Sequence, residues 1–160
     1  MNRLFILLVV SFMPLLASAY DAKIDGINYN LNNSSKQATV TFGDTRYTNS
    51  VSIPATVSYN GVNYSVTSIG NDAFSGCSNL TDITIPNSVT IIGDYAFSGC
   101  KGLTSIIFPS NITRLGYFAF RGCSNIRVIT SYIENPFTIL VGYNGPFELD
   151  TVYGLRLSVP

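Results

Sequence analysis

Three cysteines are the residues of this chain whose type and spacing point most directly to chemistry. Cys77, Cys100 and Cys123 are separated by 23 residues each, and every one follows a glycine. Three thiols could form a disulfide, bind a metal ion or act as nucleophiles. Equal spacing instead predicts one position in successive repeats, with parallel side chains that point inward. We interpret them as small residues of a core, and one disulfide with one remaining thiol is the alternative.

Other catalytic groups are scarce. The chain contains no histidine, so the commonest general base and metal ligand is missing. Hydroxyl groups of serine and threonine therefore have no base to activate them in the usual triad manner. Asp82 has no acidic counterpart at the matching positions 105 and 128, which argues against a carboxylate pair or a calcium ladder. We predict a protein that is not an enzyme and that holds no cofactor or metal.

Aromatic side chains are the remaining candidates for a binding site. The chain has ten tyrosines and ten phenylalanines but no tryptophan. Tyr95, Tyr117 and Phe118 come just before an Ala-Phe pair, where no apolar residue is required. An exposed stripe of rigid rings would give a sugar or a protein contact area at low entropic cost. The alternative is that these rings lie flat and shield the turn beneath them.

These residues belong to a pattern that is written three times. Residues 66–88, 89–111 and 112–134 are each 23 residues long and align without a gap. The first two units agree at 13 of 23 positions, and Ala-Phe and Gly-Cys recur in all three. A fixed period of this length indicates one structural unit that is stacked on copies of itself.

Each unit predicts a short strand and a turn. Ile83 and Ile85 share one face of a strand that ends at Pro86, since proline has no N–H to donate. The segment around Ala73 and Phe74 has helical spacing, which predicts about one helical turn. Such a unit can bury its apolar residues only between neighbouring copies. We therefore expect stacked parallel strands and columns of like residues, such as Phe74, Phe97 and Phe120.

The units resemble the BspA-type leucine-rich repeat of bacterial surface and secreted proteins. The pattern that carries the resemblance is IGxxAFxGCxxLTxIxIPxSVTxIG. It covers the three clear units and, more loosely, most of the rest of the chain. The resemblance implies a leucine-rich-repeat solenoid with short parallel strands plus a helical turn per coil. It also implies adhesion, because the family is associated with attachment to host extracellular-matrix proteins and to other cells, but it transfers no individual binding residue.

The outward side chains of the predicted strands form the surface that we rank first as a binding site. Solenoids present such regular surfaces to their partners. Ile107 beside Val128 would form an exposed apolar patch there. The candidate residues of this strand face are Asp82, Thr84, Ser105, Ile107, Val128 and Thr130.

Residues 1–19 have the features of a secretory signal peptide. Arg3 supplies the positive start, residues 4–16 form an apolar run, and Ala17-Ser18-Ala19 is a small-x-small cleavage site. The apolar run is shorter than the roughly 20 residues of a membrane-spanning helix, and no second apolar run follows. We expect an exported protein, secreted or at the cell surface, with the periplasm as the alternative and no membrane span after signal removal.

The charge balance excludes some partners. The chain has nine basic and nine acidic residues, and loss of Arg3 with the leader leaves eight against nine. Neither sign forms a run. Nucleic acids and anionic membrane surfaces both need clustered lysine or arginine, so we expect neither as a partner.

The two ends of the solenoid should differ from its middle. Residues 20–48 predict an N-terminal β-hairpin cap that covers the first coil, and residues 49–160 the leucine-rich-repeat solenoid. Asn60-Gly61 predicts a type I′ turn, so the first coil should carry a projecting hairpin bearing Tyr59 and Tyr64. After residue 134 the pattern frays, and we expect an irregular last coil over residues 135–160.

These features together favour a recognition protein. We expect the strand face, with the Tyr59–Tyr64 hairpin, to bind an extracellular-matrix or cell-surface protein. A carbohydrate-binding module that uses the aromatic stripe is the first alternative. A structural segment of a longer surface protein is the second.

Overall fold

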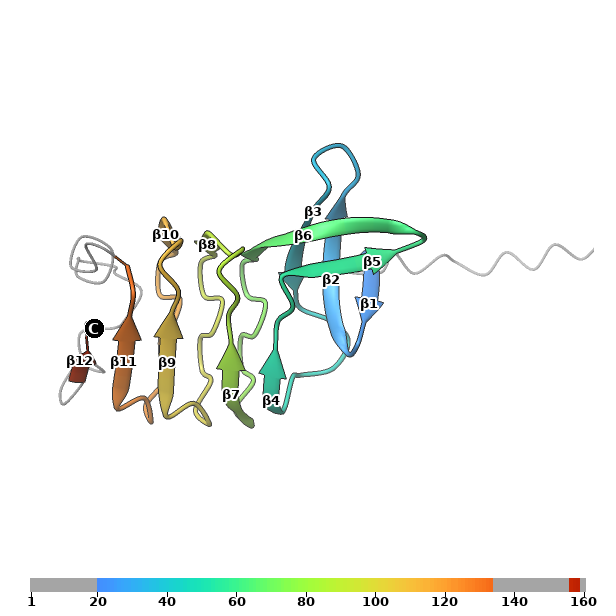
Figure 1. The fold of residues 1–160 in the computed structure, drawn as a ribbon. Coiled ribbons are helices and arrows are strands. Elements are labelled where there is room, and N and C mark those ends of the chain that lie inside the picture. The colour runs from blue at the N-terminus through green and yellow to red at the C-terminus, as the bar shows by residue number, and fades with distance from the viewer. Residues whose placement is uncertain (1–19, 134–155, 159–160) are drawn as a thin grey trace, which may run out of the picture.

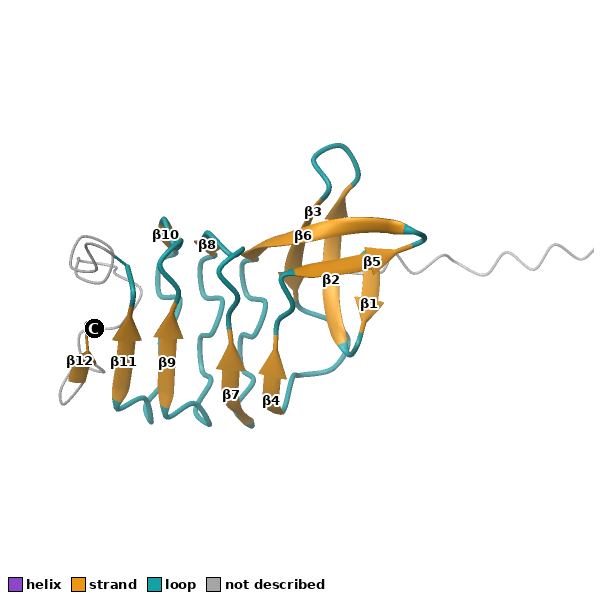
Figure 2. Cartoon of the chain, viewed as in Figure 1, coloured by secondary structure: helices purple, strands orange, loops and turns teal. Residues whose placement is uncertain are grey.

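The computed structural model describes residues 20–133 and 156–158 as a stack of coils with a β-rich cap at its N-terminal end (Figure 1). No helix occurs in this described part of the chain, which consists of strands, turns and loops (Figure 2). The strands are β1 (Ala22–Ile24), β2 (Ile27–Asn32), β3 (Gln37–Thr41), β4 (Asn49–Ser52), β5 (Thr56–Tyr59), β6 (Val62–Ile69), β7 (Leu80–Thr84), β8 (Ile91–Ile92), β9 (Ser105–Phe108), β10 (Arg114–Leu115), β11 (Val128–Ser131) and β12 (Arg156–Ser158).

The N-terminal hairpin is present and continues into the solenoid. β2 and β3 pair in antiparallel fashion, with their turn between Asn32 and Gln37. β3 then pairs in parallel with β6, which in turn pairs in parallel with β8. The result is one seven-stranded sheet, here called the cap sheet, in the order β1-β2-β3-β6-β8-β10 with β5 beside β6. Its backbone hydrogen bonds tie the cap directly to the coils.

Each regular coil contributes two strands where the sequence predicted one. The predicted strands are β7, β9 and β11, and β4 precedes them in the first coil. The additional strands, β8 and β10, are two residues long and extend the cap sheet along the other side of the coils (Figure 1). Two residues are too few to produce an alternating apolar pattern, so these strands could not be predicted from the sequence.

The helical turn predicted for each coil is wrong. The N–H of Ser75 donates to the Asp72 carbonyl within its own coil, whereas the N–H of Phe74 donates to the Ala96 carbonyl of the next coil at 2.7 Å. Because alternate N–H groups leave the coil, a continuous helical ladder cannot form. Asp72 and Gly76 also have positive φ angles of 56° and 68°, in the left-handed region that interrupts a right-handed helix.

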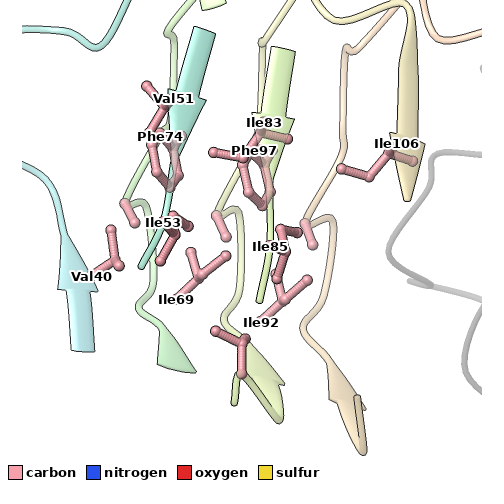
Figure 3. Close-up of a cluster of buried hydrophobic side chains, with 14 of the residues drawn as sticks. Val40, Val51, Ile53, Ile69, Phe74, Ile83, Ile85, Ile92, Phe97 and Ile106 are labelled. Atoms are coloured by element: carbon pink, nitrogen blue, oxygen red, sulfur yellow. The ribbon is translucent and has the colours of Figure 1, made fainter. Parts of the chain in front are cut away.

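The predicted aromatic column is confirmed and belongs to the buried core, where Figure 3 shows Phe74 beside Phe97. Phe74 stacks on Phe97 with 4.9 Å between ring centroids, and Phe97 stacks on Phe120 at 5.0 Å. Tyr47 packs against Phe74 at 4.7 Å and closes the column toward the cap. Phe108 meets Phe120 edge-on at 5.5 Å.

The inward positions of the first unit are buried as predicted. They are Val66, Ile69, Ala73, Phe74, Cys77, Leu80, Ile83 and Ile85. The matching positions of the next coil lie beside them in the same core (Figure 3). Burial of one such large apolar side chain contributes about 1.5–3 kcal/mol, so the stack is stabilised mainly through contacts between coils.

The coils approach one another most closely at the glycine before each turn. A Cβ atom added to Gly116 would lie 2.3 Å from the carbonyl carbon of Gly93 and 2.4 Å from the backbone nitrogen of Asp94. Backbone atoms cannot move aside as a flexible side chain can. Glycine at this position therefore sets the distance between successive coils.

Beyond the third unit, β12 pairs in parallel with β11, and Ile129 lies opposite Leu157. This strand extends the row of β9 and β11 by one member. The predicted signal peptide, residue 134 of the third unit, and residues 135–155 and 159–160 of the predicted last coil lie outside the described residues.

Candidate functional site

The predicted strand face forms one side of the coil stack. Ser105 pairs with Val128, and Ile107 pairs with Thr130, in the parallel ladder of β9 and β11. The side chains between them, Ile106 and Ile129, are buried, so the four paired residues point outward. Asp82 and Thr84 of β7 are exposed in the same alternation. All six predicted residues therefore lie on this face, with Thr130 half-buried.

The face is divided between its second and third strands. β4 pairs with β7, and β9 pairs with β11 and β12, but no ladder joins β7 to β9 in the described part of the chain. A cleft of about 350 Å³ occupies this division. The side chains that line it include Asp82, Thr84, Ser105, Ile107 and Tyr132. The expected stack of parallel strands is thus interrupted at this point, and the interruption creates a hollow on the candidate surface.

An exposed apolar patch lies next to this strand-face cleft. Ile107 is 55% exposed, Val128 40% and Tyr132 54%. Tyr132 was not among the predicted site residues, although it occupies the position of Pro86 and Pro109 in the earlier units. That departure from the pattern was the signal that could have identified it. Large apolar side chains that a single chain leaves exposed together are typical of interaction surfaces.

The other end of the strand face is polar. The Ser50 hydroxyl of β4 donates a hydrogen bond of 3.2 Å to a carboxylate oxygen of Asp82. Ser52 lies opposite Thr84 in the same pair of strands. The strand face therefore changes from polar on β4 and β7 to apolar on β9 and β11, and a partner that covers it would need both kinds of surface.

The aromatic stripe is present but is not a flat platform. The rings of Tyr95 and Phe118 are 5.6 Å apart and tilted by 34°, and Arg121 lies 5.5 Å from the centre of the Phe118 ring. Phe118 is half-buried by this packing. Tyr117 is 61% exposed, and its N–H donates to the Asp94 carboxylate at 2.9 Å. Tyr95 and Phe118 thus pack on each other, whereas Tyr117 remains exposed.

The Asn60-Gly61 hairpin has the predicted turn but not the predicted display of tyrosines. Both turn residues have positive φ, 49° and 76°, as a type I′ turn requires. Tyr59 is 37% exposed, whereas Tyr64 is only 3% exposed. The Tyr64 hydroxyl donates to the Asn33 side-chain oxygen, so Tyr64 anchors the hairpin to the cap. Its assignment to a contact surface is therefore wrong.

The three cysteines are buried and form no disulfide, as the core interpretation predicts. The Cys100 thiol donates to the Phe74 carbonyl at 3.1 Å, and the Cys123 thiol donates to the Phe97 carbonyl at 3.0 Å. Each thiol thus links its coil to the preceding one. Burial raises the pKa of the Cys77 thiol above its ordinary value. The fraction of this thiol present as the nucleophilic thiolate at neutral pH is therefore lower.

Within the described ranges, no group of three or more His, Cys, Asp or Glu side chains is placed to hold a metal ion. The same part of the chain contains no helix with the length and apolar character to cross a membrane.

Comparison with known proteins gives a consistent picture of the repeats. A family model described as "BspA type Leucine rich repeat region (6 copies)" matches residues 40–139. No curated protein matches the sequence.

Several solved structures are similar to this chain. A leucine-rich repeat protein from Bacteroides ovatus is 23% identical over 69% of this chain and 47% of its own length, with a TM-score of 0.48. A leucine rich cell surface protein from Faecalibacterium prausnitzii is 20% identical over 73% and 55%, with a TM-score of 0.32. A leucine-rich repeat protein from Bacteroides capillosus is 18% identical over 87% and 97%, with a TM-score of 0.49. This chain spans about half the length of the first two.

Proposed function

Because this chain belongs to the BspA-type leucine-rich repeat family, we propose that it is an exported, non-enzymatic recognition protein that binds another protein through its strand face. The observation that carries this proposal is the apolar patch of Ile107, Val128 and Tyr132 beside the strand-face cleft. A clustered set of exposed apolar side chains next to a hollow is where the energetically dominant contacts of protein interfaces form.

The partner that fits best is an extracellular-matrix or cell-surface protein. The family resemblance supports attachment as the role, and the features of residues 1–19 support export to the cell surface or the medium. The strand face is polar at the end that carries Ser50 and Asp82 and apolar at the end that carries the patch, so a partner can bind it in one orientation only. A partner would place an apolar anchor over Ile107 and hydrogen-bonding groups toward Asp82.

The proposal is tested by binding to immobilised collagen, laminin and fibronectin, measured by surface plasmon resonance. Ile107→Asp places a charge at the centre of the patch, and its exposed site should leave the fold intact. We expect affinity for the bound matrix protein to fall about tenfold or more, the size of a lost interface hot spot. Tyr132→Ser should act in the same direction.

The matched control is Ser78→Asp, which introduces the same charge at an exposed turn outside the strand face. It should bind as the unaltered protein does. Equal binding by Ile107→Asp and the unaltered protein would place the interface elsewhere. Absence of binding to every matrix protein would refute the proposed class of partner.

A further inference from the structure

A row of outward side chains crosses the cap sheet from the cap to the third coil. The strand register places Asn30 opposite Thr39, Thr39 opposite Ser68, Ser68 opposite Ile91, and Ile91 opposite Arg114. The Thr39 and Ser68 hydroxyls lie within 2.7 Å of each other and share a hydrogen bond. The additional strands of the coils and the hairpin of the cap thus form one continuous surface, on a sheet different from that of the strand face.

A large groove lies on this surface. The turn between β2 and β3 projects beyond β6 (Figure 1). A groove of about 630 Å³ is lined by residues of this hairpin, of β6 and of the segment that begins β8. Volumes of about 300–1,000 Å³ are usual for ligand sites. Every residue that lines this cap groove is uncharged, and amide and hydroxyl side chains predominate.

The amide side chains of the groove are held in fixed orientations. The side-chain oxygen of Asn32 accepts two backbone N–H groups of its own turn, each at 3.0 Å. The oxygen of Asn33 accepts the Tyr64 hydroxyl, and the oxygen of Gln37 accepts the Ser35 hydroxyl at 3.2 Å. Because the three oxygens are engaged, and no acceptor in residues 20–133 pairs with the NH₂ groups of these amides, each NH₂ group is available as a donor.

Further unpaired groups add to these donors. Neither the Asn30 amide nor the Thr67 hydroxyl makes a hydrogen bond with any group in the described part of the chain. Thr67 is the extra residue at a register shift between β3 and β6, and such bulges redirect side chains. Ile91, which is 38% exposed, gives the groove an apolar surface beside the donors.

We propose that the cap groove binds a neutral polysaccharide. Hydroxyl and ring oxygens of a sugar chain accept hydrogen bonds from uncharged NH₂ donors, and the C–H face of a sugar ring packs on an aliphatic side chain such as Ile91. An acidic polysaccharide would find no cationic partner among the lining residues. A peptide would find no deep apolar pocket for an anchoring side chain. The site is independent of protein binding at the strand face.

The experiment measures binding of the exported chain to soluble dextran, mannan and xyloglucan by isothermal titration calorimetry, with heparin as the anionic comparison. Asn30→Asp combined with Gln37→Glu removes two NH₂ donors with almost no change in shape. Both positions are exposed, and the Glu carboxylate can still accept the Ser35 hydroxyl. We expect the affinity for the bound neutral polysaccharide to fall about tenfold or more.

Three controls make the result specific. Asn79→Asp introduces the same charge change at an exposed amide outside the groove and should leave the affinity unchanged. Ile107→Asp should also leave it unchanged, which separates this site from the strand face. Melting temperatures close to that of the unaltered protein would show that the variants are folded.

Other outcomes would overturn the inference. They are failure to bind any of the three neutral polysaccharides, tighter binding to heparin than to all three, and full affinity in the double variant. Loss of affinity in Tyr117→Ala with retention in the double variant would move sugar binding to the aromatic stripe. If the double variant unfolds, Asn30→Ala alone tests the same groove, and unchanged affinity in that variant would equally refute it.

Discussion

The rings of Phe74 and Phe97 are parallel to within 1°, with 4.9 Å between their centroids. Phe120 continues the column at 5.0 Å and 7°. These separations match the roughly 4.7–4.9 Å between hydrogen-bonded strands, so the column contains one ring for each coil. The aromatic column therefore matches the spacing of the coils and keeps successive coils aligned.

The central ring should be the most sensitive position of the column. Phe97→Ala removes a fully buried ring that contacts both neighbours, and we expect it to lower the free energy of unfolding by about 3–5 kcal/mol. Thr84→Ala on the exposed strand face should change it by less than about 0.5 kcal/mol. Chemical denaturation of both variants provides the test. A larger loss for Thr84→Ala would reverse the assignment of inward and outward residues.

Gly116→Ala should destabilise the stack through a clash between backbones. The added Cβ would lie 2.3 Å from a backbone atom of the preceding coil, and relief requires the coils to separate. We expect a loss of about 1–3 kcal/mol, as for overpacked cores. Ser124→Ala, at an exposed position of the same coil, serves as the control in thermal melts. A variant that melts with the unaltered protein would show that the coils are less tightly apposed than described.

The three cysteine thiols should react slowly with a thiol reagent in the folded protein and should all react in the unfolded one. Because all three are buried and free, a thiol reagent at neutral pH should react slowly under native conditions and should count three thiols in denaturant. A denatured count of one would reveal a disulfide. Cys100→Ala should lose on the order of 1–2 kcal/mol, because the thiol's hydrogen bond to the Phe74 carbonyl is lost and a small cavity remains.

Alkaline pH should destabilise the fold. Burial raises the pKa of Tyr29 and Tyr47 above 10.0, and it raises the pKa of Cys77 above 9.0. A raised pKa means that the unfolded chain loses these protons first. The contribution of these protonated side chains to the free energy of unfolding is therefore fully present below about pH 9. It declines as the pH rises through 9 and 10. Urea denaturation from pH 7 to 11 measures this, and an unchanged midpoint across that range would contradict it.

Tyr29→Phe tests the cause of that decline. The Tyr29 hydroxyl is buried and has no hydrogen-bond partner in the described part of the chain. Its removal should therefore cost little at pH 7. The same change should make the decline between pH 9 and 11 shallower, because one of the titrating groups is gone. An equally steep decline would assign the effect to Tyr47 and the thiols.

The period of the repeat predicted the core because stacking depends on residue type at fixed intervals. Phe74, Phe97 and Phe120 had to coincide once the coils were stacked, and they do. The turn at Asn60-Gly61 was equally predictable, because its positive φ angles follow from local chemistry. Both predictions rest on information that is contained in one short segment or its exact copies.

The incorrect predictions depend on contacts between distant residues. The segment around Phe74 has helical spacing, but hydrogen bonds to the next coil compete with those within the segment and replace the helix with turns. Tyr64 belongs to the predicted hairpin, but Asn33, 31 residues earlier, accepts its hydroxyl hydrogen bond and holds this side chain against the cap. The cap groove combines two hairpins and a coil, so no single stretch of sequence could indicate it.

The division between β7 and β9 has a mechanical consequence. On the opposite side, the first and second regular coils are joined by the β6–β8 pairing and by the hydrogen bonds between their turns. On the strand side, none of the described strands forms a ladder across that boundary. A pulling force along the stack would therefore meet least resistance there. The two coils would separate on the strand side and rotate about the cap sheet, which would act as the hinge. If a partner binds in the strand-face cleft, as proposed above, tension applied through it would act first on that cleft.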